Sequence, residues 1–433
     1  MDKFFHSVRL DADKCKGCTN CIKRCPTEAI RVRAGKASII SERCIDCGEC
    51  IRICPHHAKR AQTDPFNKIL EYKYRIALPA PTLYGQFNNL EDVDYVLTAM
   101  KSLGFDDVFE VSAGAELISE ATRIMMNSGE LKRPVISSAC PAVCRLIRVR
   151  FPKLIPHVLP LTSPMEEAGR IAREEAVKKT GLKPEEIGVF FITPCPAKIT
   201  AVKSPICLDY SNINGAFAIK DLYPVLFQIM DKIEEPESIK KSGLIGVSWA
   251  GSGGESSALI REQYLAADGI ENVIKVLEQV EDEKLNELDF IELNACSGGC
   301  VGGPLTVENP YVAKARIQKL RKYLPVSCNH LEKSEVPEEM KWSKPLEGLS
   351  VLRLADNVIE AMTRLNELNE IHSALPGLDC GTCGAPSCRA LAEDIVRGTA
   401  SINDCVFRMG ENMDESERES FMPTPFRHNT QEE

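Results

Sequence analysis

Sixteen of the 19 cysteines in this chain fall into four ordered sets, and these sets constrain the fold more than any other feature of the sequence. Two sets lie within the first 55 residues, the third is spread over the middle of the chain, and the fourth lies between residues 380 and 405. The N-terminal segment is polar and shows no signal peptide, so we expect a cytoplasmic protein. Because cytosolic thiols stay reduced, so many cysteines indicate metal or redox chemistry rather than disulfides.

Bulk properties narrow the class further. A length of 433 residues predicts about three domains, and the net charge of -9 argues against a nucleic-acid binder. No stretch is long and apolar enough to span a bilayer, so we expect no membrane contact. The chain shows no phosphate-binding glycine fingerprint followed by a suitable acidic residue, which disfavours a nucleotide-dependent oxidoreductase.

Residues 1–70 predict a small domain built from a duplicated unit. Each unit reads Cys-x2-Cys-x2-Cys-x3-Cys-Pro, beginning at Cys15 and at Cys44. This is the spacing of bacterial two-cluster ferredoxins, in which the fourth cysteine of each run binds the other cluster. A zinc site is the alternative, but tetrahedral zinc needs two Cys-x2-Cys pairs rather than two runs of four. We therefore expect two [4Fe–4S] clusters, held by Cys15, Cys18, Cys21 and Cys54 and by Cys44, Cys47, Cys50 and Cys25.

Residues 71–335 predict an α/β domain with mainly parallel sheets, because strand-like and helix-like segments alternate. The third set of cysteines mostly follows the strand-like runs, at the strand ends where α/β folds bind ligands. Buried strands are expected at 74–78, 134–137, 188–193 and 243–248, and amphipathic helices at 90–103, 165–180 and 219–229.

Three short motifs carry the third set of cysteines. They are Val135-Ile-Ser-Ser-Ala-Cys-Pro141, Thr193-Pro-Cys-Pro-Ala-Lys198 and Glu292-Leu-Asn-Ala-Cys-Ser-Gly-Gly-Cys300. In this order they resemble the active-site signature of [FeFe]-hydrogenases, and Leu78-Pro-Ala-Pro-Thr82 adds a weaker likeness. The resemblance covers about residues 1–330.

This resemblance implies an H-cluster. A [4Fe–4S] cubane would bridge through one cysteine to a [2Fe] subsite that carries CO, cyanide and an azadithiolate, and separate maturation proteins would supply that subsite. The cubane ligands would be Cys140, Cys195, Cys296 and the bridging Cys300. One cyanide would lie near Lys198, the other in a cradle of Ala80, Pro81 and Thr82, and a glycine wall would include Gly253 and Gly254. Read without the resemblance, these cysteines are core thiols, or ligands of a cubane without the [2Fe] subsite.

The sequence departs from the efficient members of that family along the proton route. Ala139 stands where they carry a proton-transferring cysteine, and alignment of residues 114–123 keeps an outer carboxylate at Glu120 but places Arg123 at the inner position. Leu159 replaces a relay serine, and Thr193 and Asn294 replace two methionines. We therefore expect slow turnover, since proton transfer needs a group within hydrogen-bond reach.

Glu255 is a candidate substitute for the missing proton carrier, because it follows a glycine pair near the expected cofactor. Its alternative role is a helix N-terminal carboxylate that complements the helix dipole. Three further carboxylates are weaker candidates, expected on solvated helix faces: Glu116, Glu166 and Glu167.

Residues 345–410 predict a helix over about 347–372 followed by a compact cysteine unit, and residues 411–433 predict a flexible tail. The unit, with Cys380, Cys383, Cys388 and Cys405, resembles the small [4Fe–4S] domains appended to several redox proteins. Zinc is its alternative metal. The apolar side of the helix is expected to pack within the monomer, with homodimerisation as the alternative.

Taken together, the chain is similar to a ferredoxin-type [FeFe]-hydrogenase of low turnover, most like the sensory group D. The resemblance implies interconversion of dihydrogen with protons and electrons, a redox partner such as ferredoxin, and a role in sensing dihydrogen or redox state. A signalling kinase or phosphatase would be its partner in that role. The alternative is a non-catalytic iron–sulfur protein for electron transfer or cluster assembly, without the [2Fe] subsite.

Overall fold

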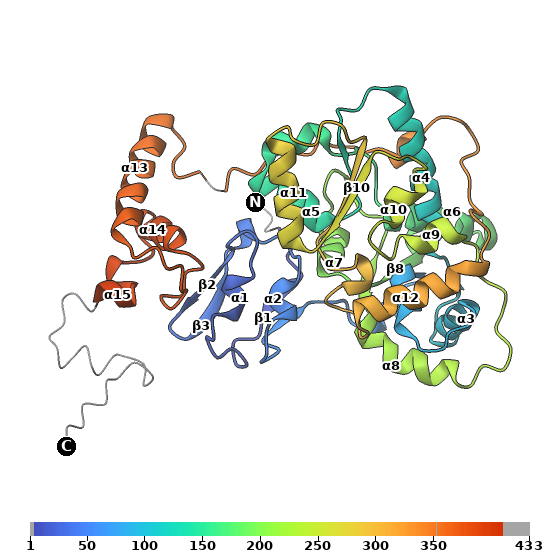
Figure 1. Ribbon diagram of the computed structural model, residues 1–433. Helices are drawn as coiled ribbons and strands as arrows, with labels where there is room; N and C mark the ends of the chain where they lie inside the picture. Colours follow the sequence, from blue (N-terminus) through green and yellow to red (C-terminus); the bar gives the residue numbers. More distant parts are fainter. Residues whose placement is uncertain (1–3, 352, 410–433) are drawn as a thin grey trace, which may run out of the picture. The chain divides into compact units, whose positions relative to one another are not determined.

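The computed structural model describes residues 4–351 and 353–409, which divide into two compact units. The first unit comprises the described parts of Met1–Arg9, Ile45–Arg52 and Lys59–Leu349. The second comprises the described parts of Leu10–Cys44, Ile53–Ala58 and Ser350–Glu433. The duplicated cysteine segment, coloured blue in Figure 1, therefore contributes to both units.

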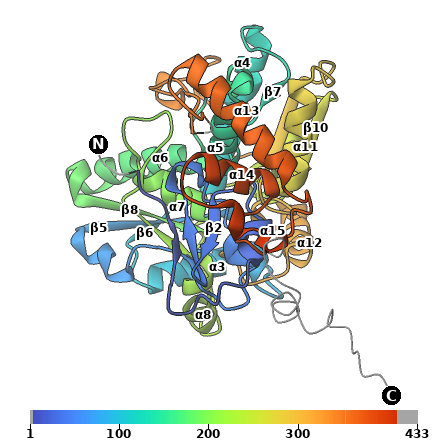
Figure 2. The same ribbon diagram turned by 90° about the vertical axis from the view of Figure 1, so that its left-hand side faces the viewer.

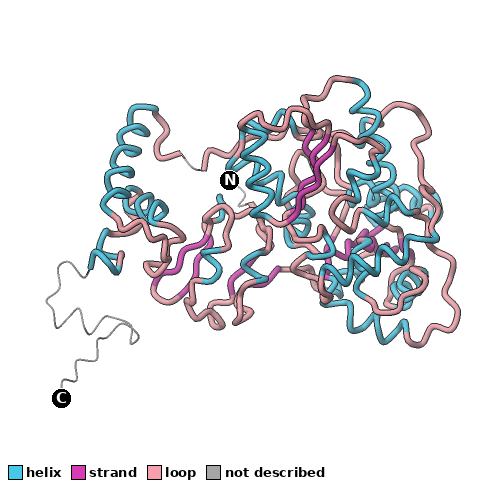
Figure 3. The backbone as a smooth tube through the Cα atoms, viewed as in Figure 1, coloured by secondary structure: helices cyan, strands magenta, loops and turns pink. Residues whose placement is uncertain are grey.

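Two parallel sheets form the framework of the first unit, which confirms the expected α/β class. One has the order β6 (Asp107–Val108), β5 (Tyr74–Pro79), β8 (Ile187–Thr193) and β9 (Gly215–Ala218). The other has the order β10 (Tyr264–Asp268), β11 (Phe290–Asn294) and β7 (Val135–Ile136). Figure 3 shows β10 and β11 side by side along their whole length.

Helices cover both faces of the four-stranded sheet, as parallel strands require. Phe190 packs with Leu97 and Leu226 on one face, and the next residue, Phe191, packs with Ala168 on the other. Figure 2 shows the sheet between α6 on one side and α3 and α8 on the other. The longer helices of this unit are α3 (Asp94–Ser102), α4 (Val111–Ser128), α5 (Pro141–Arg150), α6 (Pro164–Thr180), α7 (Pro196–Lys203), α8 (Ile219–Met230), α11 (Ile270–Glu281) and α12 (Pro310–Leu320).

One expected strand is a helix. The run at 243–248 forms α9 (Leu244–Ser248), followed by α10 (Gly254–Ala258). Gly246 lies so close to α4 that a Cβ atom there would meet the carbonyl oxygen of Ser112 at 2.1 Å. The first two amides of α9 donate to Pro325 and Val326, at 2.7 and 3.0 Å. The strand prediction is therefore wrong, because close packing on α4 decides this short apolar run.

The first unit also contains part of the duplicated cysteine segment. There α2 (Glu49–Arg52) lies beside α7, and β1 (Val8–Leu10), of which Val8 and Arg9 belong to this unit, pairs with β4 (Lys59–Ala61). Ser7 fixes this segment, because its hydroxyl donates to the carbonyl of Pro196 at 2.6 Å and its amide donates to Thr200 Oγ1 at 3.0 Å.

The second unit joins a β-hairpin of the N-terminal half to the C-terminal helices. Its elements are α1 (Asn20–Lys23), the antiparallel pair β2 (Ile30–Arg33) and β3 (Lys36–Ile39), α13 (Val358–Ala374), α14 (Cys388–Val396) and α15 (Val406–Met409). The expected helix at 347–372 begins only at Val358, because Asn357 caps it by accepting from the Glu360 amide at 2.7 Å. Residue 352 and the predicted tail at 411–433 lie outside the described residues.

Packing of α13 within its unit is limited to its C-terminal half. Leu368 is buried against α14, and Ile371 packs beside it. Val358, Ile359 and Met362 are exposed, so the expectation that the whole apolar side packs within the monomer is wrong for the first half. Among the described residues, no helix is long and apolar enough to cross a membrane.

Candidate functional site

The four cysteines of the third set line a single cavity of about 60 Å³ in the first unit. Cys140 follows β7 and caps α5, Cys195 follows β8 and caps α7, and Cys296 follows β11. Cys300 begins a short 3-10 helix, Cys300–Gly302. The cavity therefore lies at the carboxyl ends of strands from both sheets, as the sequence predicted.

Steric crowding explains why glycine stands at position 299, directly before Cys300. Gly299 has φ +90°, and a Cβ atom there would meet the Ser252 amide nitrogen at 2.3 Å. That amide donates to the Gly298 carbonyl at 3.0 Å, and the Val301 amide donates to the Ala250 carbonyl at 2.9 Å. Only glycine lets the cysteine loop approach the 250–252 segment this closely.

Two polar side chains in the cavity fit an anionic group. Thr82 is fully buried beside Ala80 and Pro81, and its hydroxyl has no hydrogen-bond partner among the described residues. Burial opposes the charge of Lys198, but negative charge on the sulfurs of Cys300 and the neighbouring cysteines, as in cluster-bound thiolates, outweighs it and raises the Lys198 pKa. An orphan hydroxyl and a cation beside four thiols suit a cofactor that combines thiolate-bound iron with anionic ligands. The four cysteines, Lys198 and the segment 80–82 would therefore suit such a cofactor.

Glu255 lies in the same cavity, at the first turn of α10. Its carboxylate is buried, and Ser137 Oγ donates to Glu255 Oε2 at 2.7 Å. Burial, reinforced by the nearby Glu292 carboxylate, raises the pKa of Glu255 to about 8. Glu255 therefore combines both expected features, a helix N-terminal position and a place in the cavity wall.

Glu292 stabilises the segment of the cavity wall that carries Glu255. Its carboxylate accepts from the Gly253 and Ser256 amides, both at 2.9 Å, and from Asn294 Nδ2 at 2.8 Å. Gly253 and Gly254 do not line the cysteine cavity; they line another cavity, formed by residues from 248–257 and from 301–321. The glycine-rich segment meets the cysteine cavity through Trp249 and Ala250 instead.

The remaining relay positions lie apart from the cavity lining. Glu120 Oε2 accepts from the Leu331 amide at 2.9 Å, and Arg123 Nη1 donates to the Ala258 carbonyl at 2.7 Å. Leu159 is buried in an apolar cluster with Leu161. None of these three belongs to the residues that line the cavity.

The prediction that three acidic residues lie on solvated helix faces is wrong. Glu116 accepts from the Gly243 amide at 2.6 Å, and Glu166 accepts from Ser211 Oγ and the Asn212 amide, both at 2.7 Å. Glu167 is buried and pairs with Arg170. All three carboxylates hold loops or neighbouring side chains against their helices, contacts that helical periodicity cannot reveal.

Sequence reasoning missed two contributors. Ser137 has no assigned role although it lies within the Cys140 motif, and Cys47 lines the cavity from the duplicated segment. Gly48 beside it has φ +81°, and a Cβ atom there would meet Pro304 Cγ at 2.5 Å and Pro196 Cγ at 2.9 Å. The segment at 45–52 thus packs directly behind the cysteine cavity, where a cluster on Cys47 and Cys50 would be next to it.

A second cavity of about 50 Å³ adjoins the first at Ala139 and Pro141. It is lined by Ser138, Thr162 and Cys144, among others. Cys144 Sγ contacts the Ser138 carbonyl at 3.4 Å, and burial raises the Cys144 pKa well above its ordinary value. The small Ala139 side chain is therefore the boundary between the two cavities.

The second unit contains two further cysteine sets. They are Cys15, Cys18, Cys21 and Cys54, and Cys380, Cys383, Cys388 and Cys405. Cys25 and Cys44 also belong to this unit, whereas Cys47 and Cys50 belong to the first. Cys18 and Cys380 are exposed, while Cys388 and Cys405 are buried beside α14.

Comparison with known proteins identifies the family. The model described as iron only hydrogenase large subunit, C-terminal domain, matches residues 73–264 and 232–304, more than half of the chain. The chain belongs to the iron-only hydrogenase family. A 4Fe-4S dicluster domain model matches residues 7–55 of this hydrogenase-family chain, and an Fe-S cluster model matches residues 375–407.

Relatives in the family differ in their described roles. The chain is 26% identical over 361 residues to the periplasmic [Fe] hydrogenase large subunit of Nitratidesulfovibrio vulgaris, covering 69% of this chain and 86% of that one. It is 24% identical to iron hydrogenase 1 of Clostridium pasteurianum, covering 58% of this chain and only 53% of that protein's length. It is also 22% identical to a "Probable cytosolic Fe-S cluster assembly factor" of Brugia malayi, covering 56% and 64%.

Solved structures of the family are also similar. A variant [FeFe]-hydrogenase from Chlamydomonas reinhardtii matches with a TM-score of 0.47 at 16% identity, covering 59% of this chain and 86% of that one. The three family models by themselves support the family and the iron–sulfur character of the chain.

Proposed function

We propose that this protein interconverts dihydrogen with two protons and two electrons at an H-cluster. One observation carries the proposal: Lys198 and the orphan hydroxyl of Thr82 share the cavity lined by the four cysteines. A cubane alone needs only the thiols, whereas both polar groups suit an anionic iron subsite. When bound, the diiron group supplies the polarisation of dihydrogen into proton and hydride.

The protein's own residues supply ligation, charge and a proton carrier. Cys140, Cys195, Cys296 and Cys300 would hold the cubane, and the proposal gives Cys300 the further role of holding the diiron group. Lys198 and Thr82, with Ala80 and Pro81, would hold the cyanide ligands.

Proton delivery is proposed to run through Glu255. Its raised pKa keeps the carboxyl largely protonated at pH 7, so it can donate a proton within the cavity. Ser137 holds the carboxyl in place. The Ala139 side chain has no exchangeable proton, so the usual relay is interrupted at this position and slow turnover follows. Glu120 remains the proposed outer carboxylate of the route.

Slow turnover suits sensing, and we extend the proposal to a dihydrogen or redox sensor of the cytoplasm. Electrons would leave to a ferredoxin-type carrier, and a signalling kinase or phosphatase would read the redox state of the clusters. Co-purification of such an enzyme, with an affinity that changes between hydrogen-reduced and oxidised protein, tests this extension.

The second candidate function is non-catalytic cluster assembly or electron transfer without the diiron subsite. The likeness to a described Fe-S cluster assembly factor favours it. Such a protein would use the four cysteines for a cubane and would have no need of the Lys198 charge.

Infrared spectroscopy separates the two functions. The protein, with its [4Fe–4S] clusters reconstituted, is matured with the diiron precursor and freed of excess precursor. We expect bands from iron-bound CO and cyanide, and expect them to be lost in the Cys300→Ser variant. Native protein with a full cubane but no CO or cyanide bands would overturn the proposal in favour of the second function.

A further inference from the structure

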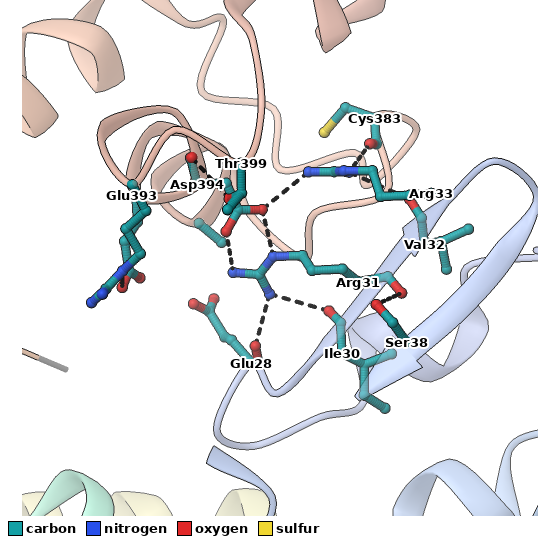
Figure 4. A network of polar contacts seen from close by, with 12 residues as sticks. Glu28, Ile30, Arg31, Val32, Arg33, Ser38, Cys383, Glu393, Asp394 and Thr399 are labelled. Atoms are coloured by element: carbon teal, nitrogen blue, oxygen red, sulfur yellow. Dashed lines mark hydrogen bonds and ion pairs between the residues drawn. The ribbon is translucent and has the colours of Figure 1, made fainter. Parts of the chain in front are cut away.

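A buried ion pair joins the C-terminal cysteine unit to the hairpin of the first ferredoxin half, within the second unit. Arg31 on β2 donates to Asp394 on α14 through Nε to Oδ2 at 2.6 Å and through Nη2 to Oδ1 at 2.9 Å. Arg33 Nη2 adds a third contact to Asp394 Oδ2 at 3.0 Å. Figure 4 shows both guanidinium groups converging on the same carboxylate. Arg31 and Asp394 are each only 6% exposed, so this ion pair is buried and does not lie on the protein surface.

The loop that carries Cys383 rests directly on β2. The Val32 amide donates to the Gly384 carbonyl at 2.9 Å, and Arg33 Nη1 donates to the Cys383 carbonyl. Gly384 has φ +82°, and a Cβ atom there would meet the Val32 carbonyl oxygen at 1.8 Å. No other residue type allows this approach, so the glycine after Cys383 serves the contact between the two segments.

The same loop also touches the turn between Cys21 and Cys25. Lys23 Nζ donates to the Pro386 carbonyl at 2.9 Å and to the Asp379 carbonyl. A Cβ atom on Gly381 would meet Lys23 Cε at 2.7 Å and Ile22 Cδ1 at 3.4 Å. Ile22 and Lys23 directly follow Cys21, and Gly381 directly follows Cys380. The binding loops of two cysteine sets are therefore in van der Waals contact.

We propose that the C-terminal cluster exchanges electrons directly with the first ferredoxin cluster, and that the Arg31–Asp394 pair is the positioning contact. The clusters are those of Cys380, Cys383, Cys388 and Cys405 and of Cys15, Cys18, Cys21 and Cys54. With both sites loaded, one electron would pass from the reduced C-terminal [4Fe–4S] cluster to the oxidised ferredoxin cluster, or in the reverse direction. A low-potential one-electron carrier supplies or removes that electron at the exposed Cys380 loop.

This inference excludes zinc at the C-terminal site, because zinc has no redox step to offer. It also makes the C-terminal cysteine set a part of the electron-transfer path rather than a separate domain without a role in that path. It does not depend on dihydrogen chemistry, since it concerns only [4Fe–4S] clusters in protein that was never matured.

Electron paramagnetic resonance of the full chain tests it. Unmatured protein with reconstituted [4Fe–4S] clusters is reduced with dithionite in four forms: native, Cys388→Ser, Asp394→Ala and Glu370→Gln. Cys388→Ser removes a ligand of the C-terminal cluster and defines the spectrum without it. Glu370→Gln changes an exposed carboxylate of α13 and is the matched control.

Native protein and the Glu370→Gln control should show a spin–spin splitting and a fast-relaxing component that Cys388→Ser lacks, in addition to the coupling between the two ferredoxin clusters that all forms share. Asp394→Ala should keep the iron content of native protein but lose that splitting. Where Asp394→Ala loses iron, Arg31→Met, which lies far in sequence from the C-terminal ligands, takes its place. Three results would overturn the inference. The ferredoxin signal could be identical in native protein and in Cys388→Ser, or the splitting could survive in the Asp394 or Arg31 variant. The third contradicting result is zinc at the C-terminal site.

Discussion

Ser137 Oγ donates a 2.7 Å hydrogen bond to Oε2 of Glu255, which lines the cavity formed by the four cysteines. The bond joins the segment after β7, which leads to Cys140, to the first turn of α10. Ser137 Oγ also accepts from the Ala139 amide at 3.2 Å. Glu255 is therefore held beside the position at which the efficient enzymes carry their proton-transferring cysteine, and this relationship makes it the proposed proton carrier.

Replacing Glu255 by glutamine should lower the rate of proton reduction by about a hundredfold, the size expected for loss of a positioned acid. Glutamine keeps the shape and accepts the same Ser137 hydrogen bond, but it carries no transferable proton. The measurement is hydrogen evolution from reduced viologen by matured protein, at matched content of CO and cyanide bands.

The matched control is Glu167→Gln, which alters another buried carboxylate that pairs with Arg170 outside the cavity. It should leave the rate within about twofold of native, since no proton passes through it. Equal rates for native protein and Glu255→Gln would remove Glu255 from the mechanism.

The rate of proton reduction should fall as pH rises through about 8, because Glu255 loses its proton there. Its folded-state pKa lies above its ordinary value of 4.5, so the native state binds the proton more tightly than the unfolded state. The contribution of Glu255 to the free energy of unfolding is therefore full below about pH 4.5 and lost as pH rises to about 8. Glu255→Gln should flatten both profiles, measured by activity and by denaturant unfolding; unchanged profiles would contradict the assignment.

Lys198→Met should retain the cubane but lower the yield of the diiron subsite several-fold. The ammonium is the cation beside the four thiols, and an apolar side chain leaves an anionic subsite without its partner. Iron content and infrared band intensity measure the two parts separately. Lys203→Met, on the same helix α7 but paired with Asp64 at 2.6 Å, is the control and should mature normally. Full maturation of Lys198→Met would contradict the role of Lys198 in holding the anionic subsite.

Asp46→Ala should destabilise the first unit by about 3 kcal/mol, the range for breaking a buried ion pair. Asp46 accepts from Arg145 Nη1 at 2.7 Å, lies 2.8 Å from His6 Nδ1, and caps the Val8 amide at 3.0 Å. Its removal takes a charged partner from the buried Arg145. Chemical denaturation measures the change, and a loss below about 1 kcal/mol would show that the contact contributes little.

The elements that the sequence predicted best are those with strong local signals. Cysteine runs show where ligands come together because several thiolates must meet on one cluster, and the apolar runs at 74–78 and 188–193 are long enough to read as buried strands. All six residues of the run at 243–248 are apolar or small, and a run of this kind suits a short helix equally well. Only its contact with Ser112 on α4 decides between them.

The contacts that determine the site are non-local and could not be read from the sequence. Ser137 and Glu255 are separated by 118 positions, and Arg31 and Asp394 by 363. Glu166 sits on a helix whose pattern places it toward solvent, but the loop at Ser211 covers it. Pairings of this kind depend on how the loops fold back over the sheets, which residue periodicity does not encode.

Isotope exchange tests the central claim most directly. Matured protein in ordinary water is placed under D2, and gas-phase mass spectrometry follows the formation of HD. The proposed function predicts HD well above the level of unmatured protein, with slower exchange in Glu255→Gln. Protein that shows CO and cyanide bands but forms no HD would contradict the claim that this site splits dihydrogen.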